Sequence, residues 1–293
     1  MKHDIKKFLE ENKYQAYLID MLTALYQKYC ADKNIGDSIN LDNLFKVLDY
    51  PIENALLNKY GGTLVDNNNV FQSIEDITCN KKLYKKNENK IFNGIAISFE
   101  AYEAVKDYYD GKTTNKLNEL IHWEHITPKS VCYRKLKEVF NIKFSKNKFK
   151  EELIKNVLNK NKIIILSKEE SALLDKKPEN WKQAYKTKWE ELSKEMQELR
   201  QYMSKKSEAL TRLYFMSLID DSIEISFDGC DTFYTISNLI NVVNEKKIST
   251  IISTIKDDEE IKKEWYLSDS YLGIETKEQG PLKSYFDNYK YNL

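Results

Sequence analysis

The sequence has few of the residues from which metal and disulfide sites are built, with 4 cysteines and 3 histidines in 293 residues. The cysteines lie far apart and form no Cys-x-x-Cys pair, which excludes a zinc-knuckle framework and fits reduced thiols. No apolar run approaches the roughly 20 residues that span a bilayer. The first residues also lack the apolar core of a signal peptide. We therefore expect a cytoplasmic protein that does not bind a membrane.

Net charge is also absent, because 46 basic residues balance 46 acidic ones. The charges are nevertheless unevenly distributed. Residues 129–162 hold ten Lys and one Arg against three Glu. Such a surplus favours contact with a nucleic-acid backbone, and a solvated pair of lysine-rich helices is the alternative. Residues 218–275 hold 13 acidic against 5 basic residues, so we expect this region to avoid nucleic acid and to shield the basic segment or dock a partner.

Apolar residues at three- and four-residue steps predict a helical amino-terminal region, residues 1–90. The first helix is expected to begin at Asp4, which can cap it. The expected elements are helices over residues 4–29, 41–48 and 52–60, followed by a loop over residues 63–93.

A short strand and a helix are expected next. Residues 94–98 have the composition of a strand, and Ser98 is placed to cap a helix over residues 99–109 that ends at Gly111. The run Asp-Gly-Lys-Thr-Thr that contains Gly111 matches the end of a phosphate-binding loop only superficially. Lys106 stands where that loop needs a glycine.

Residues 120–128, Leu-Ile-His-Trp-Glu-His-Ile-Thr-Pro, carry the most concentrated chemical signal. His122 and His125 flank Glu124 here. An imidazole can take a proton from water near neutral pH, and a carboxylate can hold a hard divalent cation, so the pair suits phosphodiester hydrolysis. On a strand, Glu124 and His125 leave opposite faces unless a turn before Pro128 re-aims one of them. The alternative is a histidine bonded to a backbone carbonyl beside a solvated glutamate.

Beyond this element the pattern predicts two helices, a strand and a further helix. The helices are expected over residues 129–140 and 148–159, and the strand over residues 163–166. The following residues, Ser-Lys-Glu-Glu, form a capping box from Ser167 to Glu170, in which Glu170 bonds back to the start of the next helix.

No glycine or proline occurs between Pro178 and Gly229, which favours a long helix. Apolar residues recur at steps of three, four and seven over residues 189–213, which predicts a single helix of about 30 residues. Its narrow apolar stripe suits a coiled coil with another chain, such as a homodimer, and equally suits packing along the protein's own core. A hairpin of residues 222–227 and 232–236 is expected beyond it, with another helix beginning over residues 236–243.

The order of features from Gly94 to Trp181 resembles the HNH, or ββα-metal, endonucleases. It looks most like the bacterial branch in which a Glu-His-x-x-Pro element is followed by helices, a short strand, a helix that opens with Lys-Glu-Glu, and a Pro-x-x-Trp. The resemblance covers roughly 90 of 293 residues. In this sequence those elements are Glu124-His125-Ile126-Thr127-Pro128, Lys168-Glu169-Glu170 and Pro178-Glu179-Asn180-Trp181.

This resemblance implies a role for each residue of the element. His125 would be the general base that activates water, and Glu124 would bind a divalent cation, magnesium or manganese. The later helix would supply another ligand, with Glu170 the first candidate and Glu169 the second. Basic side chains would also hold the phosphate backbone of the nucleic acid, and such contacts position a nucleic acid without reading its sequence. The candidates for them are Lys129, Arg134 and Lys135.

The sequence departs from the family pattern at two positions. The name-giving third histidine is missing, since no histidine follows His125. A carboxylate in its place would favour magnesium or manganese over zinc, because hard oxygen ligands suit hard cations. The middle asparagine is unassigned, and spacing does not choose among Asn141, Asn147, Asn156, Asn159 and Asn161.

These observations predict a mainly helical α+β protein. We expect a helical region at residues 1–90, a ββα-metal-like nuclease domain at residues 91–185, and a long helix with an acidic region at residues 186–293. The expected function is metal-dependent cleavage of nucleic acid, DNA more than RNA, with a role in phage defence or restriction by analogy only. The alternatives are a catalytically decayed nucleic-acid-binding or regulatory protein, and an interaction protein that uses the helix of residues 189–213.

Overall fold

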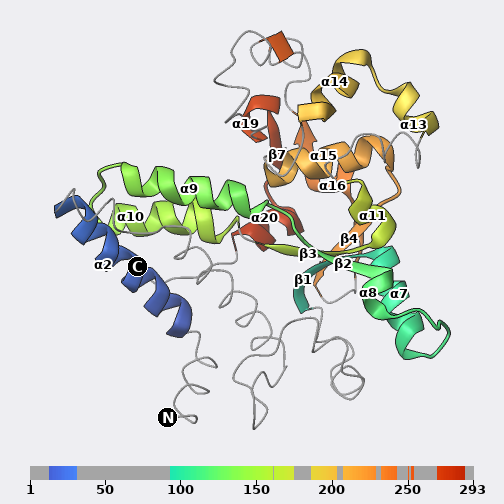
Figure 1. Cartoon of the computed structure of the whole chain (residues 1–293), viewed down its shortest axis with the longest axis horizontal. Coiled ribbons are helices and arrows are strands. Elements are labelled where there is room, and N and C mark those ends of the chain that lie inside the picture. Colours follow the sequence, from blue (N-terminus) through green and yellow to red (C-terminus); the bar gives the residue numbers. More distant parts are fainter. Residues whose placement is uncertain are drawn as a thin grey trace. The chain divides into compact units, whose positions relative to one another are not determined.

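A computed structural model gives the structure of the chain (Figure 1). It divides into two compact units, each described here by itself: residues 1–95, 132–161 and 287–293 form the first, and residues 96–131 and 162–286 the second. The domain boundaries expected from the sequence, residues 1–90, 91–185 and 186–293, stay predictions. The structure describes residues 13–31, 93–160, 162–174, 186–202, 207–228, 232–242, 250, 252–253 and 269–287. The helices expected over residues 41–48 and 52–60, the cap at Asp4 and the loop over residues 63–92 lie outside these ranges.

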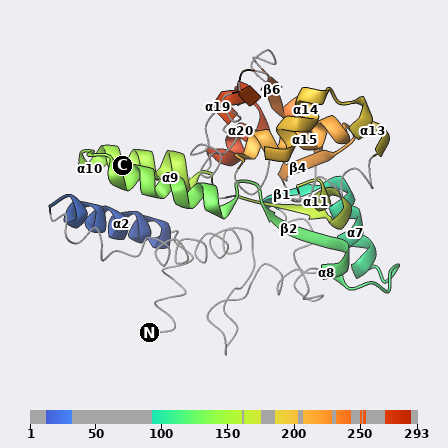
Figure 2. The same cartoon turned by 45° about the horizontal axis from the view of Figure 1, so that its top comes forward.

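The described part of the first unit is mainly helical. Its elements are α2 (Lys13–Ala31), α9 (Lys129–Asn141) and α10 (Lys146–Leu153), which continues as one π-helical turn, η1 (Ile154–Leu158). Figure 1 and Figure 2 both show α9 and α10 running alongside each other, with α2 beside them. The two helices expected over residues 129–140 and 148–159 are confirmed. The apolar faces of α2, α9, α10 and η1 form one core, which contains Ile19, Leu22, Tyr26, Cys132, Leu136, Val139, Phe140, Phe149, Leu153, Val157 and Leu158.

The second unit is built around a mixed sheet of five strands in the order β2-β3-β1-β4-β5. Strand β3 is the most buried, pairs with β1 in parallel and pairs with β2 antiparallel. The strands expected near residues 94–98 and 163–166 and the hairpin after residue 222 are confirmed, and β4 and β5 form that hairpin. The strands are β1 (Asn93–Ser98), β2 (Ile121–His125), β3 (Ile163–Ser167), β4 (Glu224–Asp228) and β5 (Tyr234–Thr235).

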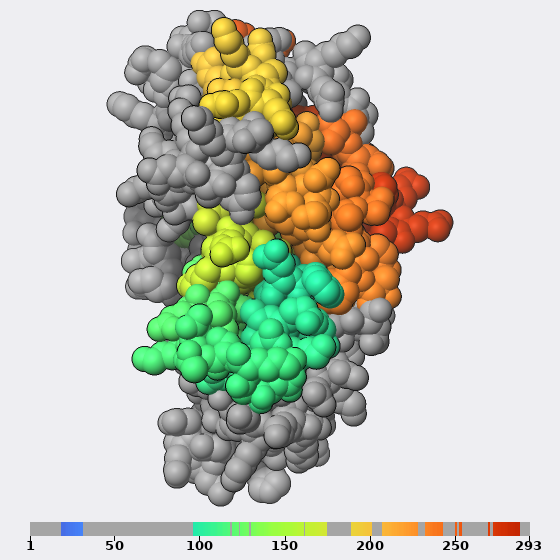
Figure 3. All heavy atoms as spheres, turned by 90° about the vertical axis from the view of Figure 1, so that its right-hand side faces the viewer, coloured from blue at the N-terminus to red at the C-terminus, as the bar shows by residue number. Residues whose placement is uncertain are grey.

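Two helices begin directly after parallel strands, as the serine positions predict. The Ser98 hydroxyl accepts a hydrogen bond from the Ala101 amide, 3.2 Å away, at the start of α7 (Phe99–Tyr109). Gly111, at φ +73°, lies just beyond the end of α7, in a conformation that glycine adopts without strain. Ser167 caps α11 (Lys168–Ala172) in the same way. Figure 3 shows α7 in teal beside α11 in yellow-green.

The single long helix expected over residues 189–213 is wrong, because the chain forms three helices: α13 (Lys186–Glu191), α14 (Lys194–Tyr202) and α15 (Ala209–Ile219). The Ser193 hydroxyl accepts from the Met196 amide at 3.2 Å and starts α14. The side-chain amide of Gln197 donates to the carbonyl of Trp189 and to that of Leu192, each at 3.0 Å. The Met196 amide and the carbonyls of Trp189 and Leu192, which would bond within a continuous helix, thus find side-chain partners. The break therefore costs little free energy of folding.

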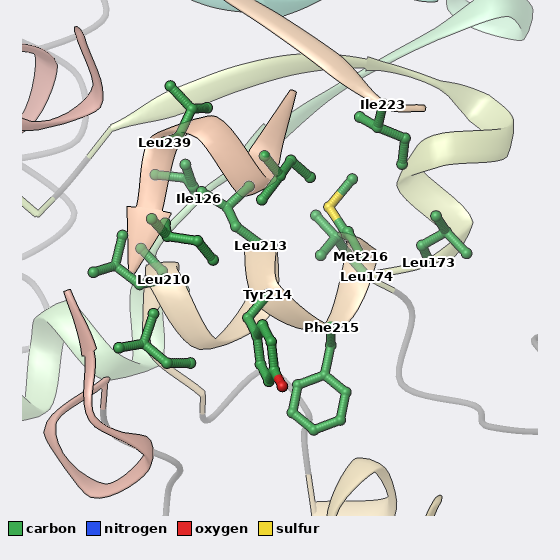
Figure 4. Close-up of a cluster of buried hydrophobic side chains, with 14 of the residues drawn as sticks. Ile126, Leu173, Leu174, Leu210, Leu213, Tyr214, Phe215, Met216, Ile223 and Leu239 are labelled. Carbon is green, nitrogen blue, oxygen red and sulfur yellow. The ribbon is translucent and has the colours of Figure 1, made fainter. Parts of the chain in front are cut away.

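The apolar stripe of this segment is buried in the second unit's own core. Met196 and Leu199 of α14 and Leu210 and Leu213 of α15 all belong to that core. Figure 4 shows Leu210, Leu213 and Met216 of α15 among side chains that include Leu173 and Leu174, which directly follow α11, and Ile223, which directly precedes β4. Of the two interpretations of the stripe, packing along the protein's own core is the one that these residues adopt, so they do not offer a seam to a second chain.

The helix expected to begin over residues 236–243 lasts only one turn, α16 (Ile236–Leu239). The chain then becomes β6 (Ile240–Val242), which pairs with β7 (Ile274–Thr276) in a second, two-stranded sheet. Pairing with this distant strand overrides the local helical pattern. The remaining described elements are α8 (Leu117–Leu120), α19 (Asp269–Leu272) and α20 (Pro281–Phe286). Across the described ranges, every helix is too short or too polar to span a bilayer.

Candidate active site

The Glu-His element lies at the end of an antiparallel strand pair that a helix follows. In the register of this pair, Glu124 lies opposite Ile164 and His125 lies opposite Ile163. Helix α11 starts where β3 ends and contacts both strands. The strand-strand-helix order of a ββα unit is therefore present, with α9 and α10 inserted between the two strands.

Glu124 is held by a buried arginine. Its Oε1 lies 2.8 Å from Nη2 of Arg212 on α15, and the Arg212 side chain is only 3% exposed. The second oxygen, Oε2, lies 3.3 Å from Nε2 of His122. His122 and Glu124 are two positions apart on β2 and share a face, as strand alternation requires. The structure therefore brings together His122, Glu124 and Arg212.

Arg212 also ties down the backbone at the end of β2. Its Nη1 donates to the His125 carbonyl at 2.6 Å and to the Ile126 carbonyl at 3.2 Å. Burial lowers the pKa of Arg212, and the charge of Glu124 opposes this effect. An arginine stays protonated in a protein, so the guanidinium is a fixed cation whose neighbours are one carboxylate and two carbonyls.

The sequence contained a signal for Arg212 that pattern reading passed over. Helix α15 reads Ala-Leu-Thr-Arg-Leu-Tyr-Phe-Met-Ser-Leu-Ile, so Arg212 is its one charged residue. A single cation in an otherwise uncharged, buried helix needs a partner of opposite charge. The sequence gives no means of finding that partner, because Glu124 lies 88 positions away.

His125 is half-buried at the last position of β2. Regular pairing continues through the His125–Ile163 partners, so no bulge re-aims a side chain within the strand. Alternation therefore directs the side chains of Glu124 and His125 to opposite faces of the strand pair. For Glu124 and His125 to face one pocket, the backbone at the end of β2 would have to change its conformation.

Glu170 occupies the capping position that the sequence allowed for it. The side chain is 4% exposed and accepts a hydrogen bond from the Ser167 amide at 2.7 Å and another from the Ser98 hydroxyl. Burial raises the pKa of Glu170, and its hydrogen bonds from Ser98 and Ser167 oppose the rise. Glu169, the second ligand candidate, is exposed.

Glu124 and Glu170 are not brought together. Glu124 lies opposite Ile164, whereas Glu170 binds Ser167, three residues and roughly 10 Å further along β3. Across the described ranges, no three His, Cys, Asp or Glu side chains gather closely enough to hold a metal ion. The carboxylates therefore do not fit a shared magnesium or manganese ion in this arrangement.

The expected backbone contacts on α9 are partly engaged elsewhere. Lys135 Nζ lies 3.2 Å from a carboxylate oxygen of Glu138, and the Lys135 side chain is 25% exposed. Arg134 is half-buried. The side chain of Lys129 lies outside what the structure describes.

No protein-family model, no curated protein and no solved structure matches this chain.

Proposed function

We propose that the chain hydrolyses nucleic-acid phosphodiesters, DNA more than RNA, through a ββα-type nuclease unit. The observation that carries this proposal is the order of three elements: β2, which ends in Glu124-His125, its antiparallel partner β3, and α11, which follows β3 directly. A role in phage defence or restriction is part of the same proposal and rests on analogy.

In this proposal His125 takes a proton from the attacking water, because a half-buried imidazole near the end of a strand can act as a general base near neutral pH. Arg212 is a positioning residue that fixes the backbone on which His125 stands. By the same proposal Lys129, Arg134 and Lys135 would contact the backbone of the nucleic acid.

The cofactor that belongs to this proposal is magnesium or manganese, which would neutralise charge on the phosphate. Glu124 is the residue that would hold it, with Glu170 as the second. Because Glu124 is bound to Arg212 and Glu170 closes a helix cap, we derive no step through the ion.

The test is to incubate the protein with plasmid DNA and with RNA, each in magnesium, manganese or EDTA. The His125→Ala variant is compared with a His3→Ala control, which removes an imidazole outside the Glu-His element. We expect cleavage by the native protein and by the control, and none by His125→Ala. Cleavage that survives His125→Ala rejects the assigned base.

A second function is favoured by the contact between Glu124 and Arg212. A carboxylate already paired with a buried guanidinium suits a nucleic-acid-binding or regulatory protein that has lost hydrolysis. This candidate predicts binding of nucleic acid in EDTA and no cleavage with either cation. The same incubations distinguish the two functions when bound and cut DNA are both measured.

A further inference from the structure

The turn between α9 and α10 presents two lysines, Lys143 and Lys146, that are paired with no acid among the residues that the structure describes. We call residues 141–148 the α9–α10 tip; its sequence, Asn-Ile-Lys-Phe-Ser-Lys-Asn-Lys, contains no acidic residue. Lys143 and Lys146 are exposed, and neither makes an ion pair within the described part of the chain. These two ammonium groups are therefore available to an external anion.

The next lysines on α10 are already engaged. Lys148 Nζ lies 2.9 Å from a carboxylate oxygen of Glu152 and 3.2 Å from one of Glu151. Lys150 Nζ lies 2.7 Å from a carboxylate oxygen of Asp20 on α2. The structure thus separates the lysines of this segment into paired and unpaired groups, which the sequence alone does not do.

The backbone of the tip is fixed by Tyr26 of α2. The Tyr26 hydroxyl donates to the Ile142 carbonyl at 2.7 Å and accepts from the Phe144 amide, so Lys143 stands between two anchored residues. The Tyr26 ring stacks on Phe149, with centroids 3.9 Å apart and an interplanar angle of 8°. A turn held in this way loses little conformational freedom when it binds a partner.

The tip also exposes an apolar side chain. Ile142 is 51% exposed, although it adjoins Lys143 in the sequence. An aliphatic group beside a cationic side chain can contact a thymine methyl or enter a base step while the cations bind the nearby phosphates. This combination fits a duplex better than it fits a free phosphate.

We propose that the α9–α10 tip is a docking surface for duplex DNA, with Lys143 and Lys146 on the phosphates and Ile142 toward the groove. This inference rests on the proposed nucleic-acid function and names the part of the chain that holds the substrate. DNA is favoured over RNA because RNA lacks the thymine methyl that offers Ile142 an apolar partner.

The test measures binding of a short, fluorescently labelled DNA duplex in EDTA at a series of salt concentrations. For the Lys143→Gln/Lys146→Gln variant, we expect affinity to fall on the order of tenfold per lysine at about 0.1 M salt. The slope of log affinity against log salt should become shallower by about 2, because each phosphate contact contributes roughly 0.9.

The matched control is Lys106→Gln/Lys112→Gln, which removes the same charge from two ion-paired lysines of the second unit. We expect its salt slope to equal that of the native protein. If both variants change the slope equally, the effect comes from net charge and the docking surface is rejected.

Ile142→Ser separates the groove contact from the phosphate contacts. We expect weaker DNA binding with an unchanged salt slope, and no effect on binding to an RNA duplex of matching sequence. Equal losses on DNA and RNA overturn the thymine contact. Binding to anionic phosphatidylserine vesicles instead of DNA, lost in the lysine variant, overturns the DNA assignment. EDTA prevents metal-dependent cleavage, so the DNA stays intact during the binding measurement. Binding through the tip can therefore be tested whether or not the protein hydrolyses DNA.

Discussion

A buried arginine of the second unit and two exposed lysines of the first use positive charge in opposite ways. In the second unit Arg212 is 3% exposed and contacts a carboxylate and two carbonyls. In the first unit Lys143 and Lys146 are exposed, without an ion pair among the described residues. A desolvated cation must be matched by nearby groups, whereas a hydrated one need not be. The buried charge therefore fixes local structure, and the exposed charges remain for a partner.

The largest effect is expected for Arg212→Met. The substitution keeps most of the side-chain volume but leaves the Glu124 carboxylate and two carbonyls without their donor. Removing one partner of a buried pair typically costs 3–5 kcal/mol, and we expect about 3 because Glu124 is partly solvated. Urea unfolding followed by circular dichroism measures the change. Lys135→Met is the control, since its surface pair with Glu138 is worth under about 1 kcal/mol.

A loss below about 1 kcal/mol for Arg212→Met, equal to that of the control, would show that the guanidinium does not hold the strand end. Arg212 would then have no structural role to set against the exposed Lys143 and Lys146.

The next prediction measures how closely Arg212 depends on Glu124. A double-mutant cycle with Glu124→Gln and Arg212→Met should give a coupling free energy of about 2 kcal/mol, within the range for directly bonded charged pairs. The single Glu124→Gln change should cost less than Arg212→Met, because the guanidinium keeps both carbonyls. Additive effects of the two substitutions would mean that each side chain contributes through other neighbours.

A smaller effect is expected at the break between α13 and α14. Ser193→Ala removes the hydroxyl that accepts the Met196 amide, and loss of such a cap costs about 1 kcal/mol. Ser237→Ala, at an exposed position of α16, is the control. Chemical denaturation measures both. A Ser193→Ala variant that gains helix content and stability would indicate that the continuous helix lies close in free energy to the broken one.

Short-range features of the fold were predictable from the sequence. The strand before Ser98, the capping box from Ser167 to Glu170 and the turn at Gly111 each depend on residues within about four positions of one another. The break at Ser193 was missed because a periodic apolar stripe is the same for one helix or three. At this break the cap by the Ser193 hydroxyl and the side-chain bonds of Gln197 mark the end of one helix and the start of the next.

The candidate site was predictable only in its sequence order. The position of Glu124-His125 at a strand end, and the helix after the second strand, follow from local patterns. The partner of Glu124 does not, because the contact with Arg212 joins positions 88 apart and depends on how α15 packs. Likewise, charge counts identified a basic segment, but only the structure separates Lys143 from the paired Lys148.

The smallest effect is expected for Glu170→Gln, and it should depend on pH. Burial raises the pKa of Glu170 above its ordinary value of 4.5. The folded state therefore binds this proton more tightly than the unfolded chain. Its contribution to stability is complete below pH 4.5 and is lost as pH rises through the raised folded-state pKa.

Glutamine cannot ionise and can still serve in a capping box. The Glu170→Gln variant should therefore not lose this stability as pH rises. Above pH 4.5 its unfolding free energy should increase relative to that of the native protein. Burial is the largest cause of the raised pKa, and the hydrogen bonds from Ser98 and Ser167 oppose it. Unfolding curves at several pH values, with exposed Glu169→Gln as the control, measure this difference in unfolding free energy. A difference that stays constant with pH would mean that Glu170 is as easily ionised as a solvated carboxylate, so that the second unit holds a buried anion as well as a buried cation.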